Sequence, residues 1–158
     1  PGVSLKLGGH WARNTIDAKL EKWSPDDRRL WRIGSRATGY CYPGEFYHPS
    51  GIDYAGGYVF VNDEPGIVHI YDPDGLFVAM LLKDPFRNKI RPVYYSEGRL
   101  PLMSPTVGEF WQMDTFVHPQ TGRTYIVCQS HEGGGWMRIY EVVGLDGVIK
   151  MTTSLELQ

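Results

Sequence analysis

Cysteine is scarce in this sequence, and the two residues present form no recognisable site. Cys41 and Cys128 lie far apart in the chain and belong to no CxxC or Cys/His pattern of the kind that binds zinc or haem. A long-range disulfide and two separate thiols therefore both remain open. Because disulfides persist in oxidising compartments, the cellular location stays open too, with an extracellular or periplasmic one preferred.

Long apolar runs and an excess of charge are also missing. No stretch of about 18 apolar residues occurs, so no membrane-spanning helix is expected. The 16 Lys and Arg residues are scattered among 18 Asp and Glu residues, for a net charge of −2. Such a chain has no basic face to follow a nucleic-acid backbone, so no nucleic-acid partner is expected.

Sequence signatures of catalysis are absent as well. There is no HxH or HExxH metal motif and no GxSxG nucleophile elbow, and the glycine run at 133–135 opens no helix that could bind phosphate. No cofactor and no metal site are therefore expected from this chain alone, and no catalytic residue is assigned.

Aromatic residues, glycine and proline are abundant instead. The chain is 13% aromatic and contains 19 Gly and 11 Pro. Aromatic and β-branched runs separated by Gly and Pro are typical of short strands and turns. We therefore predict an all-β protein.

A degenerate repeat organises these strands. The motif GEFY at residues 44–47 returns as GEFW at residues 108–111. Each copy is followed by two β-prone runs joined by a turn, and then by two more. The matching runs are 51–54 with 114–117, 58–61 with 124–128, 67–71 with 136–140, and 76–82 with 148–152. Each unit thus reads as four antiparallel strands.

The N-terminal region supplies part of an earlier unit. Residues 23–27 align with residues 71–75, and both have an aromatic residue followed by a turn rich in Pro and Asp. Residues 16–22 and 29–33 are therefore predicted strands, and a further strand before residue 12 cannot be placed. Four strands per unit, repeated at this spacing, indicate a β-propeller.

One segment fits no strand. Residues 83–105 contain four prolines and the pair Tyr94–Tyr95, and we interpret them as a long loop between blades, a plain insertion or a functional loop. The expected organisation is a partial blade of outer strands at 1–34, a complete blade at 35–84, the loop at 85–106 and a second, degenerate blade at 107–158.

The first complete unit resembles an NHL repeat. It has in order a glycine-rich start, a Gly-x-Phe, a Pro-x-Gly-Ile and a strand leading to Asp-Gly, at residues 33–39, 44–46, 49–52 and 67–75. The resemblance covers residues 33–82 well and 107–152 weakly, because the second unit lacks the Pro-x-Gly-Ile. It implies a ring of about six blades that serves mainly to bind proteins or ligands, with some relatives acting as metal-dependent lyases or lactone hydrolases.

An incomplete ring exposes apolar blade faces that other material must cover. We expect either a fragment of a longer protein, completed by its remaining blades or by other subunits, or several copies that associate. Candidate residues at the opening of a central channel are His48, Ser50, Gln112 and Asp114, whose alternative role is ordinary capping of strand ends. Tyr94, Tyr95 and Trp111 are candidates for an aromatic binding patch or, alternatively, for packing between blades.

The sequence suggests three functional hypotheses. The leading hypothesis is a non-enzymatic propeller segment that works as a binding or assembly module. The second is part of a propeller enzyme, of the lyase or lactone hydrolase type, with a channel site completed by other blades. The third is a lectin-like oligomer of short propeller units.

Overall fold

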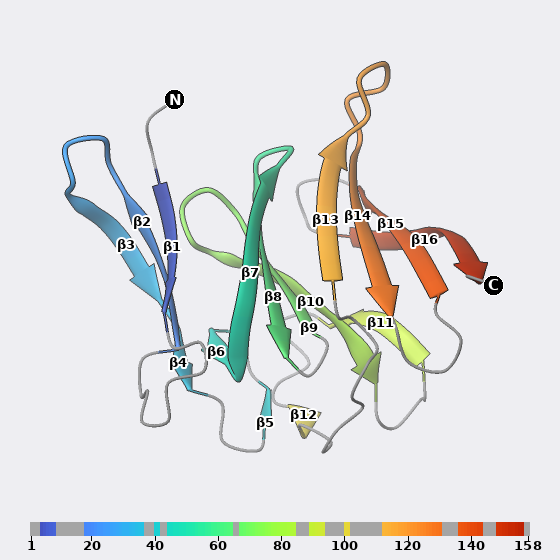
Figure 1. Cartoon of the computed structure of the whole chain (residues 1–158), viewed down its shortest axis with the longest axis horizontal. Helices are drawn as coiled ribbons and strands as arrows, with labels where there is room; N and C mark the ends of the chain where they lie inside the picture. Colours follow the sequence, from blue (N-terminus) through green and yellow to red (C-terminus); the bar gives the residue numbers. More distant parts are fainter. Residues whose placement is uncertain are drawn as a thin grey trace.

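The structure is a computed structural model, and it is all-β throughout the part that it describes. The described residues are 4–8, 18–36, 40–41, 44–64, 67–84, 89–93, 100–101, 112–130, 136–143 and 148–156. No helix occurs in these ranges. The described residues therefore contain no helix that is long and apolar enough to cross a membrane. Most strands belong to three antiparallel sheets (Figure 1), which confirms the predicted all-β class.

The first sheet contains three strands in the order of the chain. They are β1 (Ser4–Gly8), β2 (Lys19–Trp23) and β3 (Arg29–Ile33). The strand predicted at 29–33 is confirmed, and the one predicted at 16–22 begins at Lys19 in the described residues. The strand that could not be placed before residue 12 is β1.

The middle sheet contains five strands, also in chain order. They are β7 (His48–Ala55), β8 (Tyr58–Glu64), β9 (Ile67–Tyr71), β10 (Phe77–Asp84) and β11 (Lys89–Val93). A two-residue turn joins β7 to β8, and both of its residues, Gly56 and Gly57, have positive φ. That conformation is required by the hairpin turn whose twist matches the strands.

The third sheet has four strands, and two further pairs are short. The sheet consists of β13 (Gln112–Val117), β14 (Thr124–Ser130), β15 (Trp136–Val143) and β16 (Val148–Glu156). The short pairs are β4 (Ser35–Arg36) with β6 (Glu45–Phe46), which is parallel, and β5 (Tyr40–Cys41) with β12 (Leu100–Pro101).

The segment expected to hold no strand contains two, so that expectation was wrong. β11 pairs with β10 as the edge strand of the middle sheet, and β12 pairs with β5. Prolines suggested a loop because they cannot donate to a sheet, but an edge strand tolerates Pro92 where no neighbour needs its N–H. The middle sheet therefore has five strands where four were predicted.

The first two sheets share one turn geometry. The backbone N–H of Ser24 donates to Arg28 O at 2.9 Å, and that of Asp27 donates to Ser24 O at 3.1 Å. Forty-eight positions later the same two bonds recur, from Asp72 to Leu76 O at 2.9 Å and from Gly75 to Asp72 O at 3.1 Å. Asp27 and Gly75 both have positive φ.

Each of the three sheets also has a register shift beside an aromatic residue, between its last two strands in the first and third sheets and between β9 and β10 in the middle sheet. The aromatic residues are Trp23 on β2, Tyr71 on β9 and Tyr140 on β15. The pairs on either side of the shift are Trp23 with Arg29 and Lys22 with Trp31, Tyr71 with Phe77 and Ile70 with Ala79, and Tyr140 with Met151 and Ile139 with Thr153. The sheets are therefore alike in backbone layout as well as in strand order.

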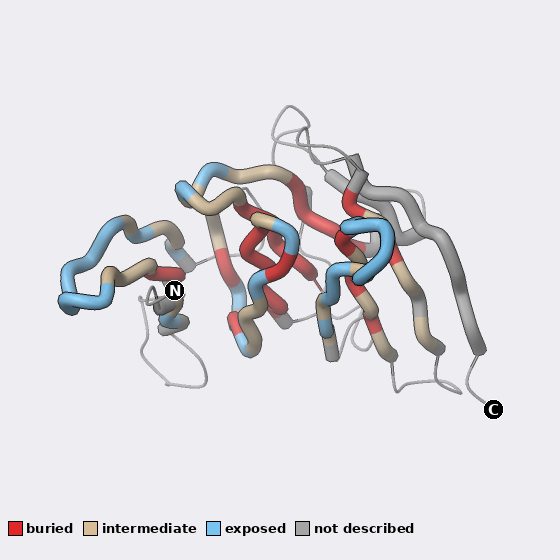
Figure 2. Tube along the Cα trace, turned by 90° about the horizontal axis from the view of Figure 1, so that it is seen from above, coloured by how far each residue is buried: buried red, intermediate tan, exposed pale blue. Residues whose placement is uncertain are grey.

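The core lies between the sheets, and the middle sheet is buried on both faces (Figure 2). β7 contacts both β1 and β13, so these three strands lie side by side (Figure 1). One cluster packs between the first and middle sheets and includes Leu20, Phe46, Val59 and Tyr71. The other packs between the middle and third sheets and includes Phe60, Ile70 and Ile126.

Cys128 belongs to this second cluster, where it is a buried thiol. The sequence left open a long-range disulfide or two separate thiols, and in the structure Cys128 is a thiol. The side chain of Cys41 lies outside the described side chains.

Candidate functional site

The residues predicted at the channel opening lie on the neighbouring strands β7 and β13. His48 and Ser50 are at the start of β7, and Gln112 and Asp114 are at the start of β13. The hydroxyl of Ser50 accepts a bond from Asn62 Nδ2 at 3.3 Å and lies 3.4 Å from Asn62 O. The structure does not describe the side chains of His48 and Gln112. A site formed by all four residues therefore cannot be assigned from the described side chains.

A carboxylate joins the middle sheet to the third sheet at these strands. Oδ2 of Asp53 on β7 accepts two hydrogen bonds from Thr115 on β13, from its backbone N–H at 3.0 Å and from its hydroxyl at 2.6 Å. Oδ1 of Asp53 accepts the N–H of the next residue, Tyr54, at 2.8 Å. We call this arrangement the carboxylate clamp. Because the acceptor is ionised, its bonds are stronger than those between neutral groups.

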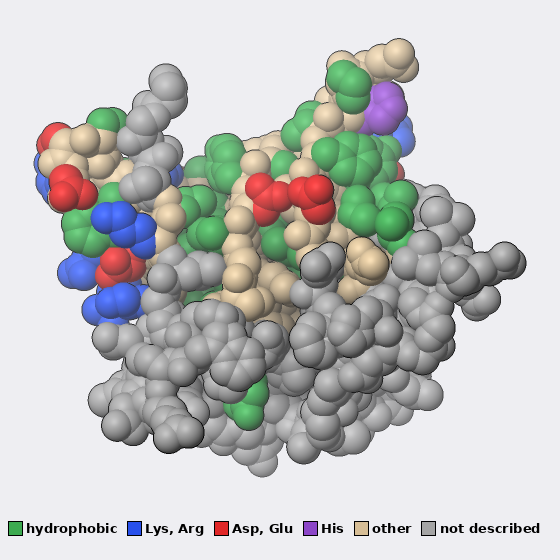
Figure 3. Space-filling model, in the orientation of Figure 1, with side chains coloured by type: hydrophobic (Ala, Val, Ile, Leu, Met, Phe, Trp, Pro, Cys, Tyr) green, Lys and Arg blue, Asp and Glu red, His purple; other side chains and the backbone are tan. Residues whose placement is uncertain are grey.

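Asp114 repeats half of this clamp. Its Oδ1 accepts the N–H of the next residue, Thr115, at 2.9 Å. Among the described residues no group donates to its Oδ2, and the side chain is exposed. Acidic side chains meet over β7 and β13 on this face of the molecule (Figure 3). The sequence singled out Asp114 but missed Asp53, whose partner is 62 residues away.

The outward face of the third sheet is apolar. Along β14 every second residue is buried against the middle sheet, and the residues between them, Tyr125, Val127 and Gln129, remain partly exposed. Phe116 is 41% exposed, and its ring stacks on Tyr125 with centroids 5.1 Å apart. We define the outward face of the third sheet as Asp114, Phe116, Tyr125, Val127, Gln129, Met137, Ile139 and Glu141.

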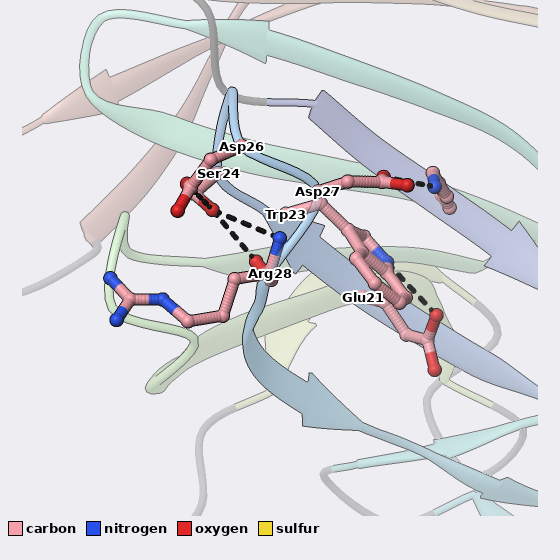
Figure 4. Close-up of polar contacts among 7 residues, drawn as sticks. Glu21, Trp23, Ser24, Asp26, Asp27 and Arg28 are labelled. Carbon is pink, nitrogen blue, oxygen red and sulfur yellow. Dashed lines mark hydrogen bonds and ion pairs between the residues drawn. The ribbon is translucent and has the colours of Figure 1, made fainter.

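The outward face of the first sheet is charged instead. Glu21 is 6% exposed and lies among the positive side chains of Lys19, Arg29 and Arg32, at 3.8, 3.3 and 4.0 Å. Its carboxylate also accepts the indole N–H of Trp23 at 3.0 Å (Figure 4). Lys6 lies 4.2 Å above the Trp23 ring.

The charges around Glu21 set its ionisation. Burial by itself opposes the charged form, but the hydrogen bond from Trp23 and the positive charges of Lys19 and Arg29 outweigh it. Together they lower the pKa of the Glu21 carboxyl below its ordinary value of 4.5. Glu21 is therefore ionised at neutral pH and holds the basic side chains of this face together.

A buried acid–histidine pair fixes the segment that leads into the middle sheet. Asp63 Oδ2 lies 3.0 Å from Nε2 of His69 and accepts the backbone N–H of Tyr47 at 2.8 Å. Both side chains are inaccessible to solvent, and the ring of Phe46 meets His69 edge-on. Nδ1 of His69 has no hydrogen-bond partner within the described part of the chain. This pair is closed off from solvent and has no surface from which to act on a substrate.

Neither a metal centre nor the aromatic patch can be built from the described residues. In that part of the chain no three His, Cys, Asp or Glu side chains come together to hold a metal ion. Tyr94, Tyr95 and Trp111 lie outside the described ranges. The site that the structure does define is an interface: the carboxylate clamp between two sheets, and the outward face beside it.

No protein-family model matches the sequence, and no curated protein is significantly similar to it. The class that the fold defines is therefore an all-β protein of three antiparallel sheets that pack face to face in chain order.

Proposed function

We propose that this chain is a segment of a β-propeller of the NHL-repeat type that acts as a non-enzymatic binding or assembly module. In this proposal each of the three sheets corresponds to a blade or part of a blade. Further polypeptide, from the same protein or from another subunit, covers the outward face of the third sheet.

The observation that carries the proposal is a likeness between two faces. The face of the middle sheet that packs on the third sheet has rows of paired residues, and the outward face of the third sheet repeats those rows in the same register. Three rows correspond. The row of Asp53, Phe60 and Ile70 matches the row of Asp114, Val127 and Ile139. The pair Ala55 and Tyr58 matches Phe116 and Tyr125, and the pair Asn62 and Val68 matches Gln129 and Met137.

These two faces differ in burial although their layouts agree. The rows of the middle sheet are almost wholly covered by the third sheet, whereas their counterparts on the third sheet remain partly exposed. Exposed apolar side chains that lie together on one face are typical of an interaction site. The repeated layout favours an occupant of the same kind as the third sheet itself, that is, another β-sheet.

The proposal is tested by measuring the exposed apolar surface of the isolated chain. We expect the chain to bind an apolar fluorescent dye and to self-associate as its concentration rises in sedimentation velocity experiments. The double substitution Phe116→Ser with Val127→Thr removes apolar groups from the outward face without touching the core, and should reduce both signals.

The matched control changes exposed apolar residues elsewhere. Leu30 and Leu76 are 44% and 67% exposed and lie near the turns of the first and middle sheets. The pair Leu30→Ser and Leu76→Ser should leave dye binding and association nearly unchanged. A wild-type chain that stays monomeric and binds no dye, or equal effects of the two double variants, would contradict the proposal.

A further inference from the structure

Asp114 occupies the position in the third sheet that Asp53 occupies in the middle sheet. Asp53 pairs with Phe60 across the first hairpin of its sheet, and Asp114 pairs with Val127 across the first hairpin of the next. Each carboxylate uses Oδ1 to accept the N–H of the residue that follows it, at 2.8 and 2.9 Å. The two side chains therefore have the same local conformation, with Oδ2 left for a partner.

The partner of Asp53 shows what such an oxygen binds. Thr115 lies on β13, an edge strand of the third sheet, and its N–H faces away from β14. Edge strands expose N–H groups that their own sheet does not use. The threonine hydroxyl adds a second donor to the same oxygen, at 2.6 Å. The clamp thus recognises an edge-strand residue that offers an N–H and an O–H together.

We propose that Asp114 is the acceptor of a second carboxylate clamp, which binds the edge strand of a further β-sheet through a threonine or serine on that strand. This inference rests on the proposed function and adds the chemistry and the position of the contact. The apolar rows beside Asp114 pack against the face of the bound sheet. Oδ2 of Asp114 sets the position of that sheet, as Oδ2 of Asp53 does for the third sheet.

The first sheet of another copy of this chain is a poor occupant by the same reasoning. Its outward face presents Lys6, Glu21 and Arg32 in one row across the sheet. Packing that row on Val127 and Ile139 would be costly, because it would remove several charges from water while the facing row offers only one charged group, Asp114. The occupant is therefore a sheet with an apolar face and not the first sheet of another copy.

A tandem chain tests the inference with a known occupant. The full chain is extended after residue 156 by a second copy of residues 94–156, which repeats the natural connection from the middle sheet to the third. In this protein Thr115 of the second copy is the donor offered to Asp114 of the first. We expect the amide of that threonine to be protected from hydrogen exchange at concentrations where the tandem chain is dilute enough not to associate.

The substitution Asp114→Asn keeps the shape of the side chain but turns Oδ2 into a donor. Placed in the first copy, it should lower the protection of the second-copy Thr115 amide about tenfold, the loss expected for a hydrogen bond to a charged acceptor. Placed in the second copy, where no sheet follows, the same substitution changes only the local acceptor of that amide. Because asparagine retains an amide oxygen at this position, the protection should fall much less than in the first variant. This second variant also controls for folding.

Each other result overturns the inference. Equal protection in both variants means that the added sheet docks without the clamp, so the role of Asp114 fails while the proposed function stands. An unprotected second copy means that the outward face does not accept such a sheet. The dye-binding test with Phe116 and Val127 decides the proposed function separately.

Discussion

The clamp at Asp53 makes the sharpest prediction for the chain as it stands. Replacing Asp53 by Asn keeps an oxygen for the Tyr54 N–H but places an NH₂ group against the two donors of Thr115, which now lie 3.0 and 2.6 Å from Oδ2. The variant therefore loses two bonds to a charged acceptor and leaves the Thr115 donors without that acceptor.

The size of the effect follows from those two bonds. Hydrogen bonds to charged groups contribute about 1.5–3 kcal/mol each, and the partial exposure of Asp53 favours the lower end of that range. We expect Asp53→Asn to lower the free energy of unfolding by about 2–3 kcal/mol. For a chain of this size this corresponds to a fall in Tm of roughly 4–10 °C, measured by thermal and urea denaturation.

Asp114→Asn is the matched control in the unextended chain. Asp114 accepts the N–H of its neighbour just as Asp53 does, but no described group of a following sheet donates to it. Its substitution should change stability by less than about 0.5 kcal/mol. Equal Tm changes in the two variants would refute the reasoning. So would a double-mutant cycle of Asp53→Asn with Thr115→Val that shows no coupling between the two residues.

Two other predictions concern the first sheet and its contact with the middle one. The lowered pKa of Glu21 contributes stability that is present above about pH 4.5 and is lost as the pH falls through the folded-state pKa. Glu21→Gln should therefore lower the free energy of unfolding by about 1–2 kcal/mol at neutral pH and by much less in acid. Urea denaturation of both proteins across this pH range tests this, and parallel pH profiles would contradict it. Gly75 has φ +83°, and an added Cβ would lie 3.1 Å from the Trp31 ring, whereas at Gly57, with φ +85°, it would meet nothing within 4 Å. Gly75→Ala should thus lower Tm more than Gly57→Ala, which carries only the backbone strain of about 1 kcal/mol.

Local features of the sequence predicted local features of the fold. The turn at residues 24–27 and its counterpart 48 positions later were found from an aromatic residue followed by Pro and Asp, and both have the same hydrogen bonds. The turn between the runs 51–54 and 58–61 was also predicted, and the structure places Gly56 and Gly57 there, both with positive φ. These signals depend on neighbouring residues, so one sequence was enough to reveal them.

Contacts between distant residues were not predictable in this way. The clamp joins Asp53 to Thr115 across two sheets, and nothing in the surrounding sequence names the partner. One signal was available: Asp is disfavoured in strands, yet it occurs in the first hairpin strand of both units, at Asp53 and Asp114. The fifth strand of the middle sheet was missed because Pro92 was given more weight than the edge position that tolerates it.

The two ends of the molecule have a consequence for how copies of it behave in a crowded solution. Proteins that join head to tail through unlike surfaces grow into filaments whenever the angle between successive copies does not close a ring. Here the two described surfaces are unlike, since the one around Glu21 is ion-paired and the one around Phe116 is aromatic. In the proposed packing a further sheet is added at the surface around Phe116, so copies of this chain do not join head to tail into filaments.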